Sequence, residues 1–195
     1  MTTTITAKGI PAEHLVELVD GLAELVATAP PPGPLRLTVR RRNGSKARTG
    51  HVLIGKGDVG KAWVLGTLAH EYAHVLDPEG PAGLNRVALR AIVPSVAAWA
   101  VAVLCAAVGQ IVAFGVAIAA ALVLLERGWR RVAIASQAAE YRADRRGAEL
   151  LGLDGVDHLV AMLDQIKDRD GHDWWRLRRR LDTHPHPDDR LAAIR

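Results

Sequence analysis

Cysteine is almost absent from this 195-residue chain, in which Cys105 stands alone. A single cysteine excludes an internal disulfide framework and any metal site built from clustered thiolates. The first residues also lack a basic segment followed by an apolar stretch, so we expect no signal peptide. Apolar residues nevertheless make up 49% of the chain and charged residues 24%. This composition excludes wholesale disorder and is sufficient for one domain with a real core.

Charge is missing altogether from residues 91–125. One straight helix of that length would run about 52 Å, well beyond the ~30 Å hydrocarbon core of a bilayer. Gly109 and Gln110 lie near the middle of the segment, which favours two short helices, 91–108 and 111–125, folded back as a hairpin. The alternative is a buried helical hairpin of a soluble protein, because alanine contributes little to membrane insertion.

Positive charge flanks both ends of this apolar segment. The flanking arginines are Arg86, Arg90, Arg127, Arg130 and Arg131. Basic flanks stay on the cytoplasmic side of a membrane, so we expect a transmembrane hairpin in the cell membrane with the rest of the chain in the cytoplasm. Trp99 and Trp129 are then expected to anchor the hairpin at the surface of the lipid bilayer.

Outside the apolar segment, helical and strand-like patterns alternate. Apolar residues recur at helical spacing over 11–29, and a proline-rich connector ends that predicted helix. Residues 35–40 and 51–54 have the pattern of short strands, and Asn43-Gly44 between them is a strong turn signal. A broad apolar helical face follows over 59–76. These elements predict a small antiparallel sheet beside a buried helix.

The most informative residues are His70-Glu71-Tyr72-Ala73-His74, an HExxH motif inside the last predicted helix. Positions i and i+4 of a helix share one face, so both imidazoles can bind one Zn²⁺. Glu71, next to the first histidine, can then reach a water on the metal as a general base. Chance produces this motif in roughly one of a hundred such chains. Unpaired His and Glu inside an apolar helix would also be costly, which favours a zinc site.

Two histidines leave a hydrolytic zinc site one protein ligand short. The residues after His74 lack the HExxHxxGxxH extension, so the third ligand must come from elsewhere. Glu140 is the best candidate, on a predicted helix over 132–151, with Asp144 one turn later on the same face. Asp144 is suited to accept a hydrogen bond from the second ring nitrogen of a metal-bound histidine. By spacing alone, a surface Glu140 paired with neighbouring arginines is an equal alternative.

The order of these motifs resembles the HtpX and CAAX-prenyl-endopeptidase family of membrane zinc metallopeptidases. The matching stretches are His70–His74, then the apolar hairpin, then Glu140–Asp144 and finally His184–Arg190. At the level of organisation the resemblance covers residues 35–195. HExxH alone is moderately specific, whereas the three motifs in this order are strongly specific.

Four residue roles are implied by the resemblance. It implies that Glu140 is the third zinc ligand and that Asp144 orients a ligand histidine. It also implies that His184 stabilises the oxyanion and that Arg190 positions that histidine or the acidic residues around the site. Without the resemblance, His184 cannot be preferred over His186, and this stretch has the pattern of a proline-stiffened terminal loop.

Together these features predict an α+β fold, namely a mainly helical zincin-like metallopeptidase domain with a small antiparallel sheet and an inserted apolar hairpin. Residues 1–34 are expected to form an N-terminal amphipathic helix and connector, and residues 35–195 the catalytic domain, interrupted by 91–125. We expect a membrane-associated zinc endopeptidase that hydrolyses a polypeptide substrate. The residues His51, Val52, Leu53 and Ile54 are expected to form an edge strand that pairs with that substrate.

Other hypotheses use the same residues. A catalytically degenerate membrane protein would keep zinc for structure or partner binding, although a structural site has no need of Glu71. A soluble partner-binding module would bury the hairpin against another subunit. Nucleic-acid binding is a further hypothesis, because basic clusters lie at Arg40–Arg42 and, beside Trp174-Trp175, at Arg176–Arg180. No nucleic-acid motif accompanies these clusters. We therefore expect no specific nucleic-acid partner, and a solvated surface or contact with anionic lipid headgroups instead.

Overall fold

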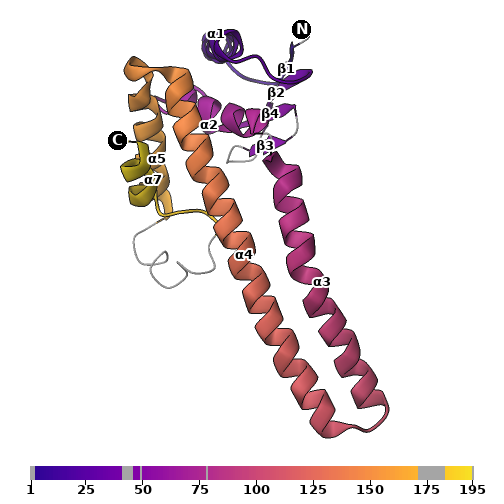
Figure 1. The fold of residues 1–195 in the computed structure, drawn as a ribbon. Coiled ribbons are helices and arrows are strands. Elements are labelled where there is room, and N and C mark those ends of the chain that lie inside the picture. The colour runs from indigo at the N-terminus through magenta and orange to yellow at the C-terminus, as the bar shows by residue number, and fades with distance from the viewer. Residues whose placement is uncertain (1–2, 41–45, 49, 78, 171–182, 195) are drawn as a thin grey trace.

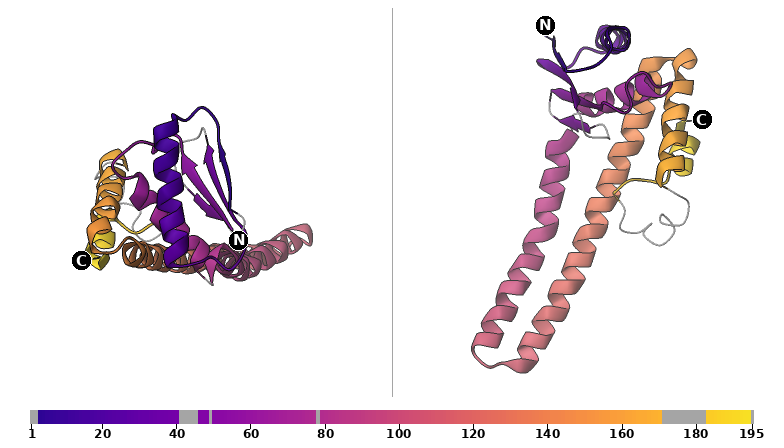
Figure 2. Two further views of the ribbon diagram at one scale, coloured as in Figure 1. Left: turned by 90° about the horizontal axis from the view of Figure 1, so that it is seen from above. Right: turned by 180° about the vertical axis from the view of Figure 1, so that it is seen from behind.

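Strands and short helices at one end of the molecule carry a long projection of two antiparallel helices (Figure 1). This computed structural model describes residues 3–40, 46–48, 50–77, 79–170 and 183–194. We call residues 91–125 the arm and the other described residues the head. The right view in Figure 2 shows the arm leaving the head as a single projection.

The head contains a four-stranded sheet with the spatial order β1-β2-β4-β3. Its strands are β1 (Thr3–Ala7), β2 (Leu35–Arg40), β3 (Lys46–Arg48) and β4 (His51–Gly55). β1 pairs with β2 in parallel, β2 pairs with β4 in parallel, and β3 runs antiparallel to β4. The prediction of an antiparallel sheet is therefore wrong, because β1, β2 and β4 form a parallel sheet.

Two features of the chain explain this pairing. Residues 3–7 are rich in β-branched side chains and form β1, and α1 (Ala12–Thr28) then provides the crossover that parallel neighbours need. The antiparallel hairpin is confined to β3 and β4, between which Gly50 has a φ of 64°. A Cβ at Gly50 would also meet the Pro34 carbonyl oxygen at 2.7 Å. Asn43-Gly44 lies outside the described residues.

The main core lies between the sheet, α1 and α2 (Val64–Leu76). Its fully buried leucine, isoleucine, valine and tyrosine side chains are Leu18, Leu35, Leu37, Val52, Ile54, Val64, Leu68 and Tyr72. The Tyr72 hydroxyl donates a hydrogen bond of 2.5 Å to the carbonyl oxygen of Ala29, which ties α2 to the end of α1. The helix that carries HExxH is therefore held on several sides. α1 shares this core with the sheet and α2. The division of the chain into two parts at residue 34 stays a prediction.

Three C-terminal elements complete the head, η1 (Leu153–Gly155), α5 (Val156–Asp170) and α7 (Pro187–Ile194). α5 packs so closely on α2 that a Cβ at Gly66 would meet the His158 carbonyl oxygen at 2.1 Å. α7 packs against α5 and α4. The stretch expected to be a terminal loop therefore ends in a helix that returns to the centre of the head.

The long helices are α3 (Gly80–Ala107) and α4 (Ile111–Leu151). Two apolar helices folded back near Gly109 were expected, and the structure confirms them. A separate helix over 132–151 was also expected, and this prediction is wrong because α4 runs without a break from the arm into the head. The charges after Leu125 end the apolar run but not the helix, since Glu, Arg and Ala are all good helix formers. α4 is about 61 Å long.

Small residues line the contact between α3 and α4, in the arm and at its base. Gly128 lies so close to α3 that a Cβ there would meet the Ala91 carbonyl oxygen at 2.7 Å. The Ser95 hydroxyl donates a buried hydrogen bond of 3.1 Å to the Ala121 carbonyl oxygen. Large apolar side chains instead face outward, among them Val96, Trp99, Val103, Leu104, Val116 and Leu122. Small residues at the contact and large apolar residues outside are the arrangement found in membrane helices.

Two helices, Gly83–Ala107 and Ile111–Leu151, are long and apolar enough to cross a membrane by length and composition. Only 17% and 11% of their most apolar windows are buried inside the molecule. The alternative of a hairpin buried in the core of this chain is therefore wrong. A soluble protein rarely exposes so large an apolar surface without a membrane or partner to cover it.

Candidate metal centre

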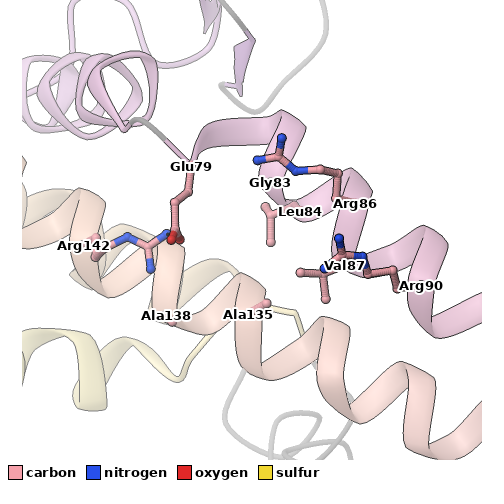
Figure 3. A pocket seen from close by; sticks show the side chains of 9 residues that line it. All are labelled: Glu79, Gly83, Leu84, Arg86, Val87, Arg90, Ala135, Ala138 and Arg142. Carbon is pink, nitrogen blue, oxygen red and sulfur yellow. The ribbon is translucent and has the colours of Figure 1, made fainter.

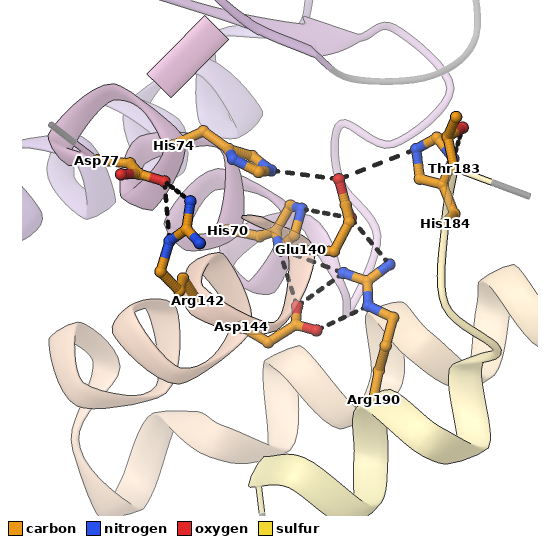
Figure 4. A network of polar contacts seen from close by, with 9 residues as sticks. All are labelled: His70, His74, Asp77, Glu140, Arg142, Asp144, Thr183, His184 and Arg190. Carbon is orange, nitrogen blue, oxygen red and sulfur yellow. Dashed lines mark hydrogen bonds and ion pairs between the residues drawn. The ribbon is translucent and has the colours of Figure 1, made fainter. Parts of the chain in front are cut away.

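The HExxH motif lies on a buried face of α2 (Figure 4). His70 and Glu71 are 6% and 8% exposed, and His74 lies one turn further along. The ring planes of His70 and His74 meet edge to face, with centroids 4.8 Å apart. Both imidazoles therefore face the same space, as the i, i+4 spacing predicts.

Glu140 is brought to these histidines by α4. Its carboxylate oxygens lie 3.4 Å from His70 Nε2 and 3.5 Å from His74 Nε2. Ligand atoms at 2.0–2.1 Å from a tetrahedral zinc ion lie about 3.3 Å from one another. Within the described residues these three side chains form the group of possible metal ligands, with their ligand atoms all within 4.8 Å of one another. Two imidazoles, one carboxylate and an open fourth position fit the donor set of a hydrolytic zinc site.

Asp144 lies one turn after Glu140 and is fully buried. Its Oδ1 accepts a hydrogen bond of 2.9 Å from His70 Nδ1. This contact places a proton on Nδ1, so Nε2, the atom nearest Glu140, is the ring nitrogen that a metal would take in exchange for its proton. The structure thus brings Asp144 to the position that the sequence resemblance implies.

Arg190 from α7 joins the two carboxylates of α4. Its Nε and Nη2 donate hydrogen bonds of 2.7 Å to the two oxygens of Asp144, and Nη1 lies 3.3 Å from Glu140 Oε2. Arg190 is only 3% exposed, so this bidentate ion pair lies away from water. Arg190 Nη2 also lies 3.3 Å from His70 Nδ1, and none of these contacts is with His184.

Electrostatics in this cluster favour positive charge. Burial opposes protonation of His70, but hydrogen bonds with Asp144 and Glu140 outweigh it and raise its pKa to about 9. Burial acts to raise the pKa of Glu140, yet hydrogen bonds with the two histidines hold it well below its usual value. Burial likewise opposes ionisation of Asp144, and hydrogen bonds from Arg190 and His70 lower its pKa. Both carboxylates therefore remain ionised, which suits a cation at the site.

Glu71 behaves differently from the two carboxylates of α4. Burial raises its pKa, against the opposing influence of His70 and His74. A carboxylate whose pKa is raised toward neutrality accepts and releases protons more readily. Of the acidic side chains around the centre, Glu71 is thus the one suited to proton transfer.

The structure separates His184 from His186. His184 Nε2 lies 3.9 Å from Glu140 Oε1, its Nδ1 lies 3.2 Å from the Thr183 hydroxyl, and its side chain is 57% exposed. His186 instead accepts a hydrogen bond of 3.2 Å from the backbone N–H of Asp188, at the start of α7. His184 therefore stands beside the metal centre, while His186 caps a helix, a distinction that spacing alone leaves open.

The strand expected to bind substrate lies elsewhere in the sheet than predicted. His51, Val52, Leu53 and Ile54 belong to β4, which lies between β2 and β3 in the sheet; β2 pairs with all four residues and β3 with the first three. The edge-strand assignment is therefore wrong, and β3 forms that edge of the described sheet. The His51 ring also lies 3.0 Å from the Thr38 hydroxyl on β2.

Sequence reasoning also missed a contact between the two helices of the centre. Arg142, on the opposite side of α4 from Glu140, donates a hydrogen bond of 3.0 Å to Asp77 at the end of α2 and lies 3.2 Å from Glu79. In the sequence, the one hint of this contact is that Arg142 lies two residues after Glu140. Arg41, Arg42, Trp174, Trp175 and Arg176–Arg180, raised above for nucleic acid or lipid, lie outside the described residues.

Comparison with known proteins supplies an independent result. No curated protein and no solved structure matches the chain. Residues 44–195, which contain the HExxH motif, the arm, Glu140, Asp144 and Arg190, match the description "Peptidase family M48". This match covers most of the chain, and the chain therefore belongs to peptidase family M48, a family of metallopeptidases.

Proposed function

We propose that this protein is a membrane-attached zinc endopeptidase whose head acts at the cytoplasmic face of the cell membrane. The observation that carries the proposal is the convergence of His70, His74 and Glu140 within 4.8 Å, beside a buried Glu71. Membership of a metallopeptidase family supports polypeptides as the substrate class. The exposed apolar arm, flanked by arginines, supports membrane attachment and the cytoplasmic orientation.

The residues of the centre divide the chemistry of peptide hydrolysis between them. His70, His74 and Glu140 would hold the zinc ion. When bound, zinc polarises the scissile carbonyl and lowers the pKa of a water molecule. Glu71 takes the proton of the attacking water on its carboxylate and returns it to the leaving amine. The raised pKa of Glu71 supports this assignment.

Two residues from the C-terminal part of the chain complete the proposed machinery. His184 is assigned to the oxyanion, supported by its exposure and its place 3.9 Å from Glu140. Loss of one such donor typically costs about 3 kcal/mol of transition-state stabilisation. Arg190 is assigned as a positioning residue, supported by its hydrogen bonds to Asp144 and its proximity to Glu140.

Substrate pairing is assigned to β3 (Lys46–Arg48) in place of β4. β3 is the last strand in the described sheet order and also lies against α2, the helix of the HExxH motif. An extended peptide added to an exposed strand gains backbone hydrogen bonds in register. Such a peptide would run past the metal centre along α2.

The test combines metal content with cleavage of casein in detergent, for the wild type and Glu71→Gln. We expect one zinc per chain in both proteins and a fall in cleavage of at least about 100-fold in Glu71→Gln, because a general base typically contributes that much or more. Glu149→Gln is the matched control, since Glu149 is a 62% exposed carboxylate on the surface of α4 whose ion pair, among the residues that the structure describes, is with Arg146.

Each outcome separates the hypotheses. Zinc in the wild type, with cleavage lost in Glu71→Gln and kept in Glu149→Gln, supports the endopeptidase. Zinc in all three proteins without cleavage in any would favour a catalytically degenerate protein with structural zinc. A wild type that binds no zinc after purification without chelators and reloading would overturn the proposal.

A further inference from the structure

A pocket of ≈ 370 Å³ opens between α3 and α4 where the arm meets the head (Figure 3). It is lined by Glu79, Gly83, Leu84, Arg86, Val87, Arg90, Ala135, Ala138 and Arg142. Leu84 and Val87 point from α3 toward the small residues of α4, and Glu79 and Arg142 approach each other at one end. The proposed hydrolytic chemistry makes no use of this pocket.

The charges around the pocket are unbalanced. Arg142 is already engaged, by Asp77 at 3.0 Å and by Glu79 at 3.2 Å. Arg86 and Arg90 are exposed, and neither has an ion pair with any residue that the structure describes. Three arginines thus face one glutamate, and Arg86 and Arg90 remain available for an anion.

The position of the pocket along α3 matches the headgroup layer of a bilayer. Arg90 is the last charged residue before the uncharged arm. From Arg90 to Gly83 the helix rises about 10 Å. The interfacial region on each side of the hydrocarbon core is about 5–8 Å thick. With the arm in the bilayer, the pocket would therefore lie at the level of the lipid phosphates.

The pocket lining also continues into the arm. Leu84, Val87, Ala135 and Ala138 give it apolar walls, and below Arg90 the exposed surface of α3 is apolar, with Ile92 46% and Val93 54% exposed. A soluble anion would gain nothing from these walls. An anion with attached acyl chains would fill both the basic rim and the apolar surface below it. Basic pockets between membrane helices on the cytoplasmic side are typical sites for anionic headgroups.

We propose that this pocket binds one anionic phospholipid, with its phosphate between Arg86 and Arg90 and its acyl chains along the arm. The inference rests on the membrane attachment in the proposed function but not on peptidase activity. A lipid seated between α3 and α4 would fix their separation where α4 passes from the arm toward Glu140. The pocket would thus couple bilayer composition to the geometry of the head.

The test counts lipids that stay bound after transfer into a neutral detergent, by native mass spectrometry. The purified protein is first placed in bilayers containing phosphatidylglycerol and phosphatidylcholine. We expect the wild type to keep one phosphatidylglycerol per chain in preference to phosphatidylcholine. In Arg86→Gln/Arg90→Gln this retention should fall about 30-fold, because each interfacial arginine contributes about 1 kcal/mol.

Arg127→Gln/Arg131→Gln is the matched control. It removes the same charge from α4 at the same level of the arm, but neither residue lines the pocket. Lipid retention in this control should stay close to that of the wild type. Equal losses in the two double variants would indicate general electrostatic attraction and overturn the proposal. So would retention of phosphatidylcholine as readily as phosphatidylglycerol.

A second variant tests the cavity without changing charge. Ala135→Phe fills the pocket from α4 and leaves all three arginines in place. We expect it to lose the retained lipid while keeping helical content and bound zinc, and undiminished lipid retention would overturn the proposal. An excess of inorganic phosphate should not displace the lipid, and displacement would assign the site to phosphate alone. Flotation with liposomes separately reports membrane attachment, so a failure of the proposed membrane attachment can be distinguished from a failure of the lipid site.

Discussion

The two halves of α4 follow opposite rules of burial. In the head, Glu140 and Asp144 are only 9% and 0% exposed, whereas in the arm Val112 and Val116 are 83% and 65% exposed. Neither arrangement is stable by itself in water. The head compensates for Glu140 and Asp144 because both carboxylates meet His70 and Arg190. The arm has no such compensation within the described residues, so its outer surface needs a membrane or a partner subunit to cover it.

One continuous helix therefore joins the apolar arm to the charged centre of the head. From Leu125, the last residue of the arm, to Glu140 the helix rises about 22 Å. If the arm lies in the bilayer, the metal centre stands at most about that far above its edge. A membrane-anchored substrate would need several extended residues beyond its own anchor to reach the centre, since an extended chain gains about 3.3 Å per residue.

The largest expected effect comes from breaking the buried charge cluster of the head. Asp144→Ala leaves Arg190 buried without its bidentate partner and His70 without the acceptor of its Nδ1–H. We expect the free energy of unfolding to fall by about 3–5 kcal/mol. Zinc affinity should fall about 10–100-fold because the His70 ring is no longer oriented. Denaturant titration and competitive zinc binding measure the two effects.

A double variant separates the two causes. In Asp144→Ala/Arg190→Met the unpaired cation is gone, so much of the lost stability should return, because a buried pair replaced by apolar side chains is often neutral. Zinc affinity should remain low, since His70 still lacks its acceptor. A double variant no more stable than Asp144→Ala would contradict the idea that the desolvated Arg190 causes the loss.

Sequence patterns predicted the parts of this site that depend on local spacing. HExxH lies on one helical face because i and i+4 positions always do. Glu140 could only be proposed, because its alternative, a surface ion pair, has the same spacing. His184 and His186 differ in their tertiary contacts, which no local pattern records. Only the structure shows that His186 binds the first turn of α7.

The fold was predicted in the same uneven way. α1, β2 and the two arm helices follow from apolar periodicity and agree with the structure. Strand pairing does not follow from periodicity, because it depends on residues distant in sequence. β4, for example, pairs with both β2 and β3. The continuity of α4 was missed because a change from apolar to charged residues ends a membrane segment without ending a helix. Periodicity thus predicts elements better than it predicts their neighbours.

The second prediction contrasts two positions on α4 directly. Val116 in the arm and Ile134 beyond the arginines are 65% and 66% exposed. Val116→Arg should reduce liposome association about 100-fold, because an arginine near the centre of a membrane helix costs about 2.5–3.5 kcal/mol. Ile134→Arg should leave association unchanged. Flotation with liposomes measures both.

Folding of both variants is checked in detergent by helical content, which should match the wild type because neither side chain is buried. Equal flotation of Val116→Arg and Ile134→Arg would remove the distinction between arm and head. The apolar surface would then belong to a partner subunit, as the soluble-module hypothesis holds.

The smallest expected effect concerns an exposed ion pair of the head. Arg142 is 46% exposed and pairs with Asp77 and Glu79. Arg142→Gln should lower the free energy of unfolding by less than about 1 kcal/mol, since water screens exposed pairs. Asp77 also keeps the hydrogen bond of 3.0 Å that it accepts from the backbone N–H of Glu79. Denaturant titration at low and high salt measures the effect, which salt should reduce.

Arg146→Gln provides the control for Arg142→Gln. Arg146 is 47% exposed and pairs with Glu149 within α4, so its loss affects one helix and not the contact between α2 and α4. Similar small losses in both variants would mean that burial, and not the number of ion pairs, decides which charges stabilise the head. If Arg142→Gln alone lowered the free energy of unfolding by more than about 3 kcal/mol, the ion pairs of Arg142 would be a main contact holding α2 to α4, outside the buried cluster.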